Sequence, residues 1–234
     1  MQCQKIEIVG VAGTGKSTLA RTLAARDPAN RIADSLHTKS TAHWAYVARS
    51  VPHVLPLLAR SARVRPPFDW EETKFIVYVT EWRRFLRRDC RDDWGLVVLD
   101  QGPIFALARL LWGRKPVTAT REFERWLDHQ IASWSVDLDG IVWLVAPEEV
   151  LLERINDRER DHEAKGRSVR EGLDVLQAHQ NAYRVLFERL EALGRPPVFT
   201  FDTSLVSPAQ ITEEIEGVLR PDPSRRSVNA GPSG

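Results

Sequence analysis

The chain has 234 residues, 43% of them hydrophobic and 28% charged, which is enough apolar material for one large α/β domain or two small ones. Its formal net charge of +1 gives no broad basic surface, so a nucleic-acid partner is not expected. No apolar stretch approaches the ~20 residues that cross a bilayer, and the N-terminal apolar run is too short for a signal peptide, so we expect a cytoplasmic protein with no membrane partner.

A short apolar strand followed directly by a glycine-rich turn is the first feature along the chain. Residues 5–10 read KIEIVG, and GVAGTGKST then runs from Gly10 to Thr18. The spacing Gly10-x-x-x-x-Gly15-Lys16-Ser17 matches the phosphate-loop pattern in full, and a helical segment follows it. In such a loop the backbone N–H groups surround phosphate oxygens, and the positive end of the following helix adds to the attraction.

This loop predicts the nucleotide site. The spacing lets Lys16 reach the β- and γ-phosphates, and it lets the Ser17 hydroxyl ligate Mg²⁺. The alternative is a glycine-rich turn with an incidental lysine, but the strand before the turn and the helix after it favour a phosphate loop. The expected cofactors are therefore ATP and Mg²⁺. The predicted nucleotide-binding residues of the loop are Gly10, Ala12, Gly13, Thr14, Gly15, Lys16, Ser17 and Thr18.

A second short strand is predicted at residues 31–36, with Asp34 near its end. Two helical segments follow at 40–50 and 70–92, and we expect the substrate-binding helices within residues 37–94. A proline-rich break is expected between the two segments, at Pro52, Pro56, Pro66 and Pro67.

The second of these helical segments carries two patterns with open interpretations. One is an apolar stripe that is either core or a platform for a base, and the spacing favours core. The other is the basic run RRFLRR at residues 83–88, which either binds an anionic substrate such as a monophosphate or forms a solvated helix face. The stripe consists of Phe75, Tyr78, Val79 and Trp82.

A third strand is predicted at residues 95–100, where the continuous apolar run GLVVLD ends in Asp100. An acid at this place suits the role of holding Mg²⁺ through water, and the alternative role is an ordinary cap at the end of a strand. A helix is expected to begin at Pro103, which is well placed for a first helical position. Asp100 is thus a candidate for both metal binding and catalysis.

The rest of the chain continues the alternation of strands and helices. Strands are predicted at 140–147 and 197–202, and helices at 121–134, 173–194 and 207–219; a helix that begins at 148 turns into a dense run of charges. This order predicts a parallel sheet covered on both faces, within a domain of residues 1–220. Residues 221–234 are rich in Pro, Ser and Gly, and we expect them to be disordered.

The phosphate loop, the turn Asp100-Gln-Gly-Pro103 and the charge run LLERINDRERDH resemble the P-loop nucleoside and nucleotide kinase superfamily, with a thymidylate-kinase-like order over residues 5–219. The resemblance implies a three-layer P-loop NTPase fold with a five-stranded parallel sheet and a helical lid at about 154–170. The chain departs from the family at Gln101, because those kinases commonly have arginine close behind the acid of this turn.

The resemblance also implies roles for four residues. Arg154 would stack on adenine, Arg158 would contact the phosphates, and the loop at Thr203 would line the adenine pocket. The alternative for both arginines is a solvated helix with internal ion pairs. Asp34 would orient the acceptor hydroxyl or accept its proton, and its alternative role is a cap of the following segment, in which case Asp100 or no protein base takes the proton.

These observations together predict an ATP-dependent phosphotransferase that moves the γ-phosphate to a small-molecule acceptor, with a nucleoside or nucleotide preferred. The alternative is a regulatory nucleotide-binding ATPase, related to AAA family ATPases, that acts through partners. An N-K-x-D guanine motif is absent from the sequence, which disfavours a GTPase. The sequence leaves the identity of the acceptor and a homodimer open.

Overall fold

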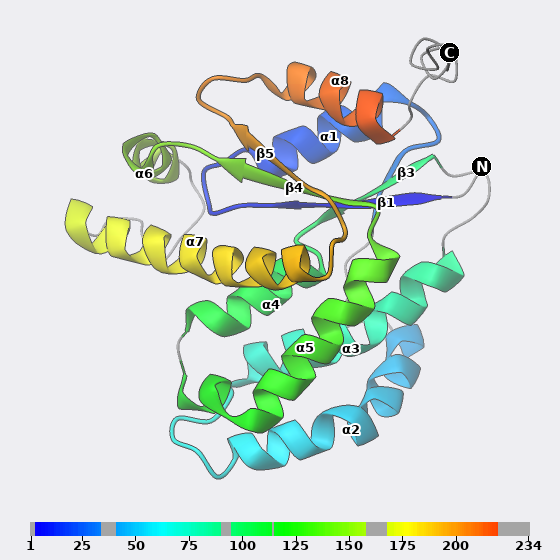
Figure 1. Cartoon of the computed structure of the whole chain (residues 1–234), viewed down its shortest axis with the longest axis vertical. Helices are drawn as coiled ribbons and strands as arrows, with labels where there is room; N and C mark the ends of the chain where they lie inside the picture. Colours follow the sequence, from blue (N-terminus) through cyan, green and yellow to red (C-terminus); the bar gives the residue numbers. More distant parts are fainter. Residues whose placement is uncertain (1–2, 34–40, 90–94, 114, 158–167, 220–234) are drawn as a thin grey trace, which may run out of the picture.

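Five parallel strands form one sheet in the order β2-β3-β1-β4-β5, which confirms the predicted five-stranded parallel sheet (Figure 1). The computed structural model describes residues 3–33, 41–89, 95–113, 115–157 and 168–219, without the side chains of 41–47, 85, 88 and 89. The strands are β1 (Gln4–Val9), β2 (Arg31–Ile32), β3 (Leu96–Asp100), β4 (Gly140–Val145) and β5 (Val198–Asp202).

The phosphate loop follows the central strand of this sheet. Strand β1 lies between β3 and β4, and its Ile8 is in register with Asp100 on one side and with Val142 on the other. Because all strands run in the same direction, the ends of β1, β3, β4 and β5 meet at one edge of the sheet. Open α/β sheets bind ligands at this edge, next to the strand where the order reverses.

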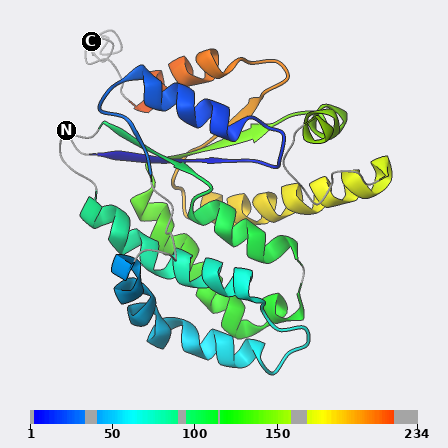
Figure 2. The same cartoon turned by 180° about the vertical axis from the view of Figure 1, so that it is seen from behind.

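Helices cover both faces of the sheet, as Figures 1 and 2 show from opposite sides. Helices α1 and α8 lie on one face, and α4, α5 and α7 lie on the other, with α2 and α3 packed beyond them. The helices are α1 (Lys16–Arg26), α2 (Thr41–Ser61), α3 (Trp70–Asp89), α4 (Pro103–Trp112), α5 (Arg121–Asp137), α6 (Glu148–Asn156), α7 (Val169–Ala192) and α8 (Pro208–Leu219), with a short 3-10 helix η1 (Pro116–Ala119). None of the described helices combines the length and the hydropathy needed to span a bilayer.

Alternation along β1 divides the core into two layers. Ile6 and Ile8 pack with the apolar residues of α1 and α8, whereas Val9 packs with the larger layer built by α3, α4, α5 and α7. Side chains that alternate along a strand point to opposite faces, so Glu7 lies on the same face as Val9. Glu7 is fully buried there, which places one ionisable group inside an apolar layer.

The predicted break between α2 and α3 is shorter than expected, and this part of the prediction was wrong. Helix α2 continues through Pro52 and Pro56 and ends at Ser61. Each proline removes one helical hydrogen bond, but both lie on the exposed face, where water can satisfy the freed carbonyl groups. The buried residues Val54 and Leu57 on the opposite face pack into the core and hold the helix together.

Candidate active site

The phosphate loop joins β1 to α1, and its glycines adopt conformations that other residues rarely adopt. Gly10 has a φ of +144°, and a Cβ atom there would lie 2.4 Å from the carbonyl oxygen of Leu144 on the neighbouring strand. Gly15, with a φ of +85°, is the N-cap residue of α1. The close approach at Gly10 and the left-handed turn at Gly15 explain why glycine occupies these positions.

Hydrogen bonds within the loop fix its shape. The Thr14 hydroxyl and the Lys16 ammonium group both donate to the carbonyl oxygen of Val11, each at a distance of 2.9 Å. Thr14 is buried, whereas Ser17 and Thr18 lie exposed in the first turn of α1. All eight residues predicted for the loop therefore lie together at the carboxyl end of β1.

Arg154 brings together three segments that the sequence analysis singled out separately. From α6, its guanidinium group donates to the carbonyl oxygen of Gly13 in the loop (3.3 Å) and to the hydroxyl and carbonyl oxygens of Thr203 after β5 (3.0 and 3.1 Å). The base of a nucleotide bound at this end of the phosphate loop would contact the Arg154 guanidinium group, which is held between two loops.

The loop after β5 is ordered by its own acid. The Ser204 hydroxyl and backbone N–H donate to Asp202 over 2.6 and 2.8 Å. These bonds, helped by the charge of Arg154, hold the pKa of Asp202 below its usual range. Asp202 therefore keeps its negative charge near neutral pH and fixes the turn that presents Thr203.

Asp100 ends β3 beside the phosphate loop, and one of its oxygens is unsatisfied. Its Oδ1 atom is buried and has no hydrogen-bond partner among the described residues. A buried carboxylate oxygen without a donor is costly, and water molecules on a metal ion are suitable donors. Asp100 and the exposed Ser17 hydroxyl therefore fit a Mg²⁺ ion held at the loop, with Asp100 acting through water.

The turn after Asp100 has an unusual backbone conformation at one residue. Gln101, the residue that departs from the kinase pattern, has a φ of +65°, which residues other than glycine seldom adopt. The following Gly102 precedes α4, which starts at Pro103 as predicted. The turn is thus held in a strained shape directly after the candidate metal-binding acid.

Glu7 is a residue of this region that the sequence analysis missed. Its Oε1 accepts from the N–H of Phe105 (2.8 Å), and its Oε2 accepts from the N–H of Ile104 (2.9 Å). Burial raises the pKa of Glu7 to about 8, although these donors and the N–H of Gly102 oppose the shift. The signal was visible in the sequence, since Glu7 is the one acid inside the apolar run of the first strand.

The apolar stripe of α3 lies in the core at two of its four residues. Val79 and Trp82 are fully buried, and the Trp134 indole N–H donates to the Val79 carbonyl oxygen, as the predicted core role requires. Phe75 and Tyr78 are half-buried. Tyr78 is the member nearest the site, because its hydroxyl lies 3.5 Å from the Gln101 carbonyl oxygen.

The basic run of α3 is largely neutralised by acids. Arg83 and Arg87 bind Asp137 at the end of α5, and Arg84 binds the buried Glu81. These ion pairs favour a structural role for the run over the binding of an anionic substrate.

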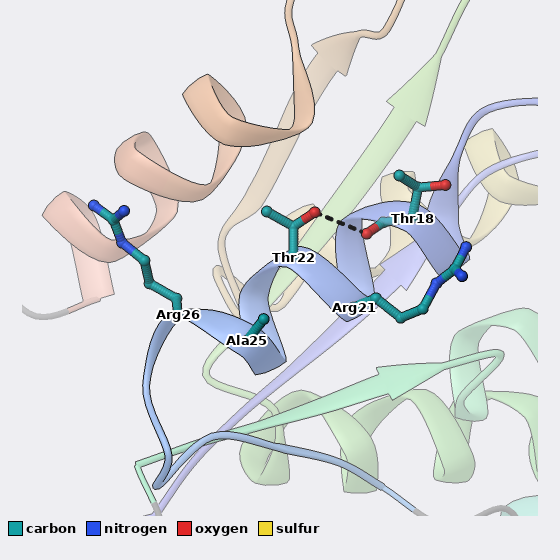
Figure 3. A pocket seen from close by; sticks show the side chains of 5 residues that line it. All are labelled: Thr18, Arg21, Thr22, Ala25 and Arg26. Carbon is teal, nitrogen blue, oxygen red and sulfur yellow. Dashed lines mark hydrogen bonds between the residues drawn. The ribbon is translucent and has the colours of Figure 1, made fainter.

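Two hollows lie outside the phosphate loop. The first follows the exposed side of α1, where two threonines, one alanine and two arginines line it (Figure 3). One of these arginines, Arg26, pairs with Glu216 of α8. Of its lining residues only Thr18 belongs to the predicted nucleotide site. They are Thr18, Arg21, Thr22, Ala25 and Arg26.

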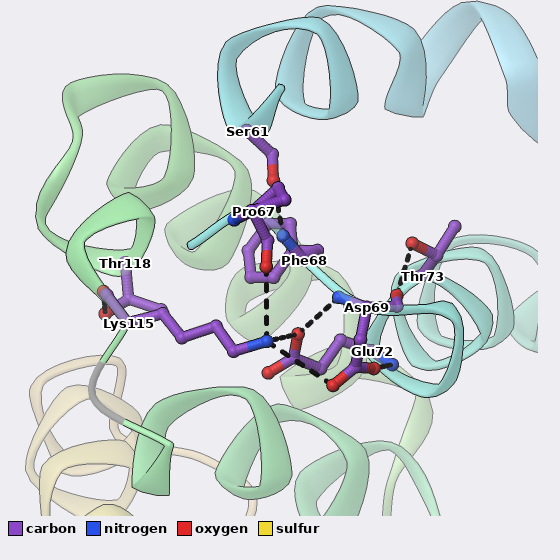
Figure 4. A network of polar contacts seen from close by, with 8 residues as sticks. All are labelled: Ser61, Pro67, Phe68, Asp69, Glu72, Thr73, Lys115 and Thr118. Atoms are coloured by element: carbon purple, nitrogen blue, oxygen red, sulfur yellow. Dashed lines mark hydrogen bonds and ion pairs between the residues drawn. The ribbon is translucent and has the colours of Figure 1, made fainter. Parts of the chain in front are cut away.

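The second hollow, of about 300 Å³, lies between α3, α4 and α7 and includes Phe75, Trp112 and His179. The acids that line it are already engaged. Lys115 pairs with both Asp69 and Glu72 and ties the start of α3 to the segment before η1 (Figure 4), and Glu71 pairs with Lys74. The Lys115 network therefore acts as a structural clamp.

Some predicted residues cannot be placed. Asp34, Arg158 and most of the predicted lid lie outside the described residues, as does the tail at 221–234. Within the described ranges, no group of three or more His, Cys, Asp or Glu side chains is arranged to hold a metal ion.

Comparisons with solved structures agree with this fold. Deoxyadenosine kinase from M. mycoides with bound dATP is similar in structure, with a TM-score of 0.53, 15% identity, and coverage of 93% of this chain and 100% of that chain. Thymidylate kinase from Candida albicans is also similar, with a TM-score of 0.57, 13% identity, and coverage of 94% and 92%. No curated protein matches the sequence.

A protein family described as AAA domain matches residues 6–183, well over half of the chain. The match begins inside β1, includes the whole phosphate loop and ends in α7. The chain therefore belongs to the AAA domain family of P-loop proteins, and it has the fold of the nucleoside and nucleotide kinases.

Proposed function

We propose that this protein is an ATP-dependent phosphotransferase that moves the γ-phosphate of Mg·ATP to a small-molecule acceptor. The observation that carries the proposal is the phosphate loop at the end of β1 with the unsatisfied oxygen of Asp100 on the adjacent strand. Phosphoryl transfer requires positioning and neutralisation of charge rather than a protein nucleophile, and the loop, Lys16 and Asp100 supply both.

Each residue then has a distinct task. Lys16 exchanges the Val11 carbonyl oxygen for phosphate oxygens when ATP binds, because a charged acceptor is the stronger partner. Ser17 and Asp100 hold Mg²⁺, which neutralises charge on the β- and γ-phosphates when bound. Arg154 contacts the adenine side of the nucleotide between Gly13 and Thr203.

The acceptor side of the proposal is a nucleoside or nucleotide. The two similar structures are a deoxyadenosine kinase and a thymidylate kinase, which supports this acceptor class. Arg158, on a lid that closes over ATP, is proposed to contact the phosphates during transfer, and closure would exclude water from the reaction. The proposal also places the protein in the cytoplasm, where ATP and such acceptors are available.

A panel of acceptors tests this function. ADP release should be slow with ATP alone and should rise strongly with one class among nucleosides, nucleoside monophosphates, sugars and antibiotics. The variant Lys16→Ala provides the background rate. If no small molecule stimulates ADP release and a protein partner does, the regulatory ATPase is correct and the phosphotransferase is not.

Asp34 is the proposed base, and one conservative variant tests it. Asp34→Asn keeps the size of the side chain and removes its basicity, so ATP should bind normally while transfer falls by ~10²-fold or more. If Asp34→Asn transfers phosphate at the wild-type rate, the role passes to Asp100 or to no protein base.

A further inference from the structure

Glu7 is an acid in the central strand of the sheet, and its hydrogen-bond partners lie at the start of α4. The side chain is fully buried in β1, and its two oxygens accept the N–H groups of Ile104 and Phe105. The N–H of Gly102 is a third donor to it. Buried acids are retained only where such donors compensate for lost water, so these contacts are the reason that the strand tolerates an acid.

The turn before α4 is shaped around this acid. A Cβ atom on Gly102 would lie 2.6 Å from the Glu7 Cδ atom and 2.9 Å from its Oε2 atom. The φ of Gly102 is −80°, which any residue can adopt, so the backbone conformation does not require glycine. Glycine is required here because the Glu7 carboxyl group occupies the space that a side chain would need.

The same turn carries the residues that face the nucleotide site. Asp100, with its unsatisfied Oδ1, comes two residues before Gly102, and Gln101 between them holds a left-handed conformation. The Tyr78 hydroxyl contacts the Gln101 carbonyl oxygen from α3. A strained residue persists only where its surroundings determine its shape. Here Tyr78 contacts Gln101 itself, and Glu7 holds the residues that follow it.

The first residue of the phosphate loop is contacted by a tyrosine of α7. The Tyr183 hydroxyl is 3.5 Å from the Gly10 carbonyl oxygen. Burial raises the pKa of Tyr183 and of Tyr78, and the charge of Glu7 adds to both shifts. The charge of one buried acid therefore acts on a group that contacts the phosphate loop and on a group that contacts the turn after Asp100.

We propose that Glu7 is a positioning residue of the nucleotide site, which caps α4 and thereby fixes the turn at Asp100–Pro103 so that Asp100 is held in place for a metal–nucleotide complex. The proposal rests on the binding of Mg²⁺ and ATP that is part of the proposed function, but it does not depend on transfer to an acceptor. Residues that orient metal-binding groups from behind typically change metal affinity or activity by ~10- to 100-fold when they are replaced.

The variant Glu7→Gln tests this role with little change in shape. Above its pKa of about 8, Glu7 is a carboxylate with two oxygens that accept N–H groups, so the test is made at about pH 9. At that pH the Gln amide loses one acceptor and sets an NH₂ group against a donor. The matched control is Glu81→Gln, the same change at an equally buried acid on α3 that pairs with Arg84. ATP affinity is measured by calorimetry for each protein, once with Mg²⁺ and once with EDTA.

We expect Glu7→Gln to weaken ATP binding by ~10-fold or more in Mg²⁺ and to leave binding in EDTA nearly unchanged. Glu81→Gln should change neither value. The amide protons of Ile104 and Phe105 should also exchange faster in Glu7→Gln than in the wild type. A purely structural cap would lower stability without this selective loss, so equal losses in Mg²⁺ and EDTA, or no loss in either, overturn the proposal.

The outcomes separate this inference from the proposed function. The positioning role is supported if Glu7→Gln loses ATP affinity only in Mg²⁺. If the wild type also transfers phosphate to no acceptor, the phosphotransferase is overturned while the positioning role stands. Wild-type protein that binds no ATP overturns both. If Glu7→Gln does not fold, Gly102→Ala gives the same measurement, because the added methyl group displaces the Glu7 carboxyl group from the turn.

Discussion

The phosphate loop and the turn at Asp100–Pro103 lie side by side at one edge of the sheet, yet they are held in different ways. The loop is shaped by its own residues, since Thr14 and Lys16 both donate to the carbonyl oxygen of Val11. The turn is shaped by Glu7, which precedes its partner Ile104 by 97 positions. A site can thus combine one part that is set locally with another that depends on the folded sheet.

Removing the lysine of the locally determined loop should give the largest effect. Lys16→Ala removes the charge that stabilises the migrating phosphoryl group, so turnover should fall by ~10²- to 10³-fold, as for other lost electrostatic contacts in a transition state. Transfer assays measure the turnover, and the melting temperature should stay near that of the wild type.

The control for this lysine is Lys74→Ala, which removes a half-buried lysine of α3 that pairs with Glu71. Its turnover should match the wild type. Near-normal turnover in a folded Lys16→Ala protein would contradict the role of the loop in phosphoryl transfer.

A double-mutant cycle tests whether Glu7 and Gly102 shape each other. Gly102→Ala alone should destabilise the protein because its methyl group meets the Glu7 carboxyl group, and Glu7→Ala alone should destabilise it by leaving the N–H donors of α4 unpaired. Combining the two should cost less than the sum by about 2 kcal/mol, since the cavity accepts the methyl group. Urea unfolding measures the free energies, and strictly additive effects would show that the two residues are independent.

The pH dependence of stability should distinguish the turn from the loop. Burial raises the pKa of Glu7 from 4.5 to about 8. Between these values the folded protein holds a proton that the unfolded chain has released, so the contribution of Glu7 to the free energy of unfolding falls as pH rises, by up to ~1.4 kcal/mol per pH unit.

Glu7→Gln removes this dependence, so its stability relative to the wild type should increase from about pH 5.5 to about pH 7.5 in urea unfolding. Lys16→Ala should show the pH dependence of the wild type over the same range. Parallel curves for wild type and Glu7→Gln would mean that Glu7 does not titrate between these values.

Arg154 links the loop to the segment after β5, and its replacement should have the smallest effect. Arg154→Lys keeps the charge but cannot span the carbonyl oxygen of Gly13 and both oxygens of Thr203. ATP affinity should fall by about fivefold, or ~1 kcal/mol, with turnover at saturating ATP unchanged. The exposed Arg184 offers the control Arg184→Lys, and an equal effect in both variants would remove Arg154 from the site.

Sequence patterns predicted the parts of the molecule whose structure is decided by neighbouring residues. The five strands, the phosphate loop and the start of α4 at Pro103 follow from apolar runs, glycine spacing and the position of a proline. Sequence patterns did not predict that α2 continues through Pro52 and Pro56. The packing of α2 on α3 outweighs the tendency of proline to end a helix.

The site divides in the same way. The loop residues were visible as a motif, and Arg154 and Thr203 could be selected through a family resemblance. The hydrogen bonds that Arg154 makes to Gly13 and to Thr203 depend on the order of the strands, which a linear sequence does not display. Glu7 could have been noticed as an acid in an apolar strand, but its partners at α4 come from a distant part of the chain.

The most direct test of the proposed phosphotransferase activity is to follow an isotopic label from ATP to the acceptor. The protein is incubated with Mg²⁺ and ATP that carries ¹⁸O in its γ-phosphate, together with the acceptor that stimulates ADP release, and the products are examined by mass spectrometry. If the protein is a phosphotransferase, the labelled phosphoryl group appears on the acceptor in a one-to-one ratio with ADP. Lys16→Ala should then abolish both the labelled product and the ADP. Labelled inorganic phosphate formed with ADP, with no label on any acceptor, would contradict this activity.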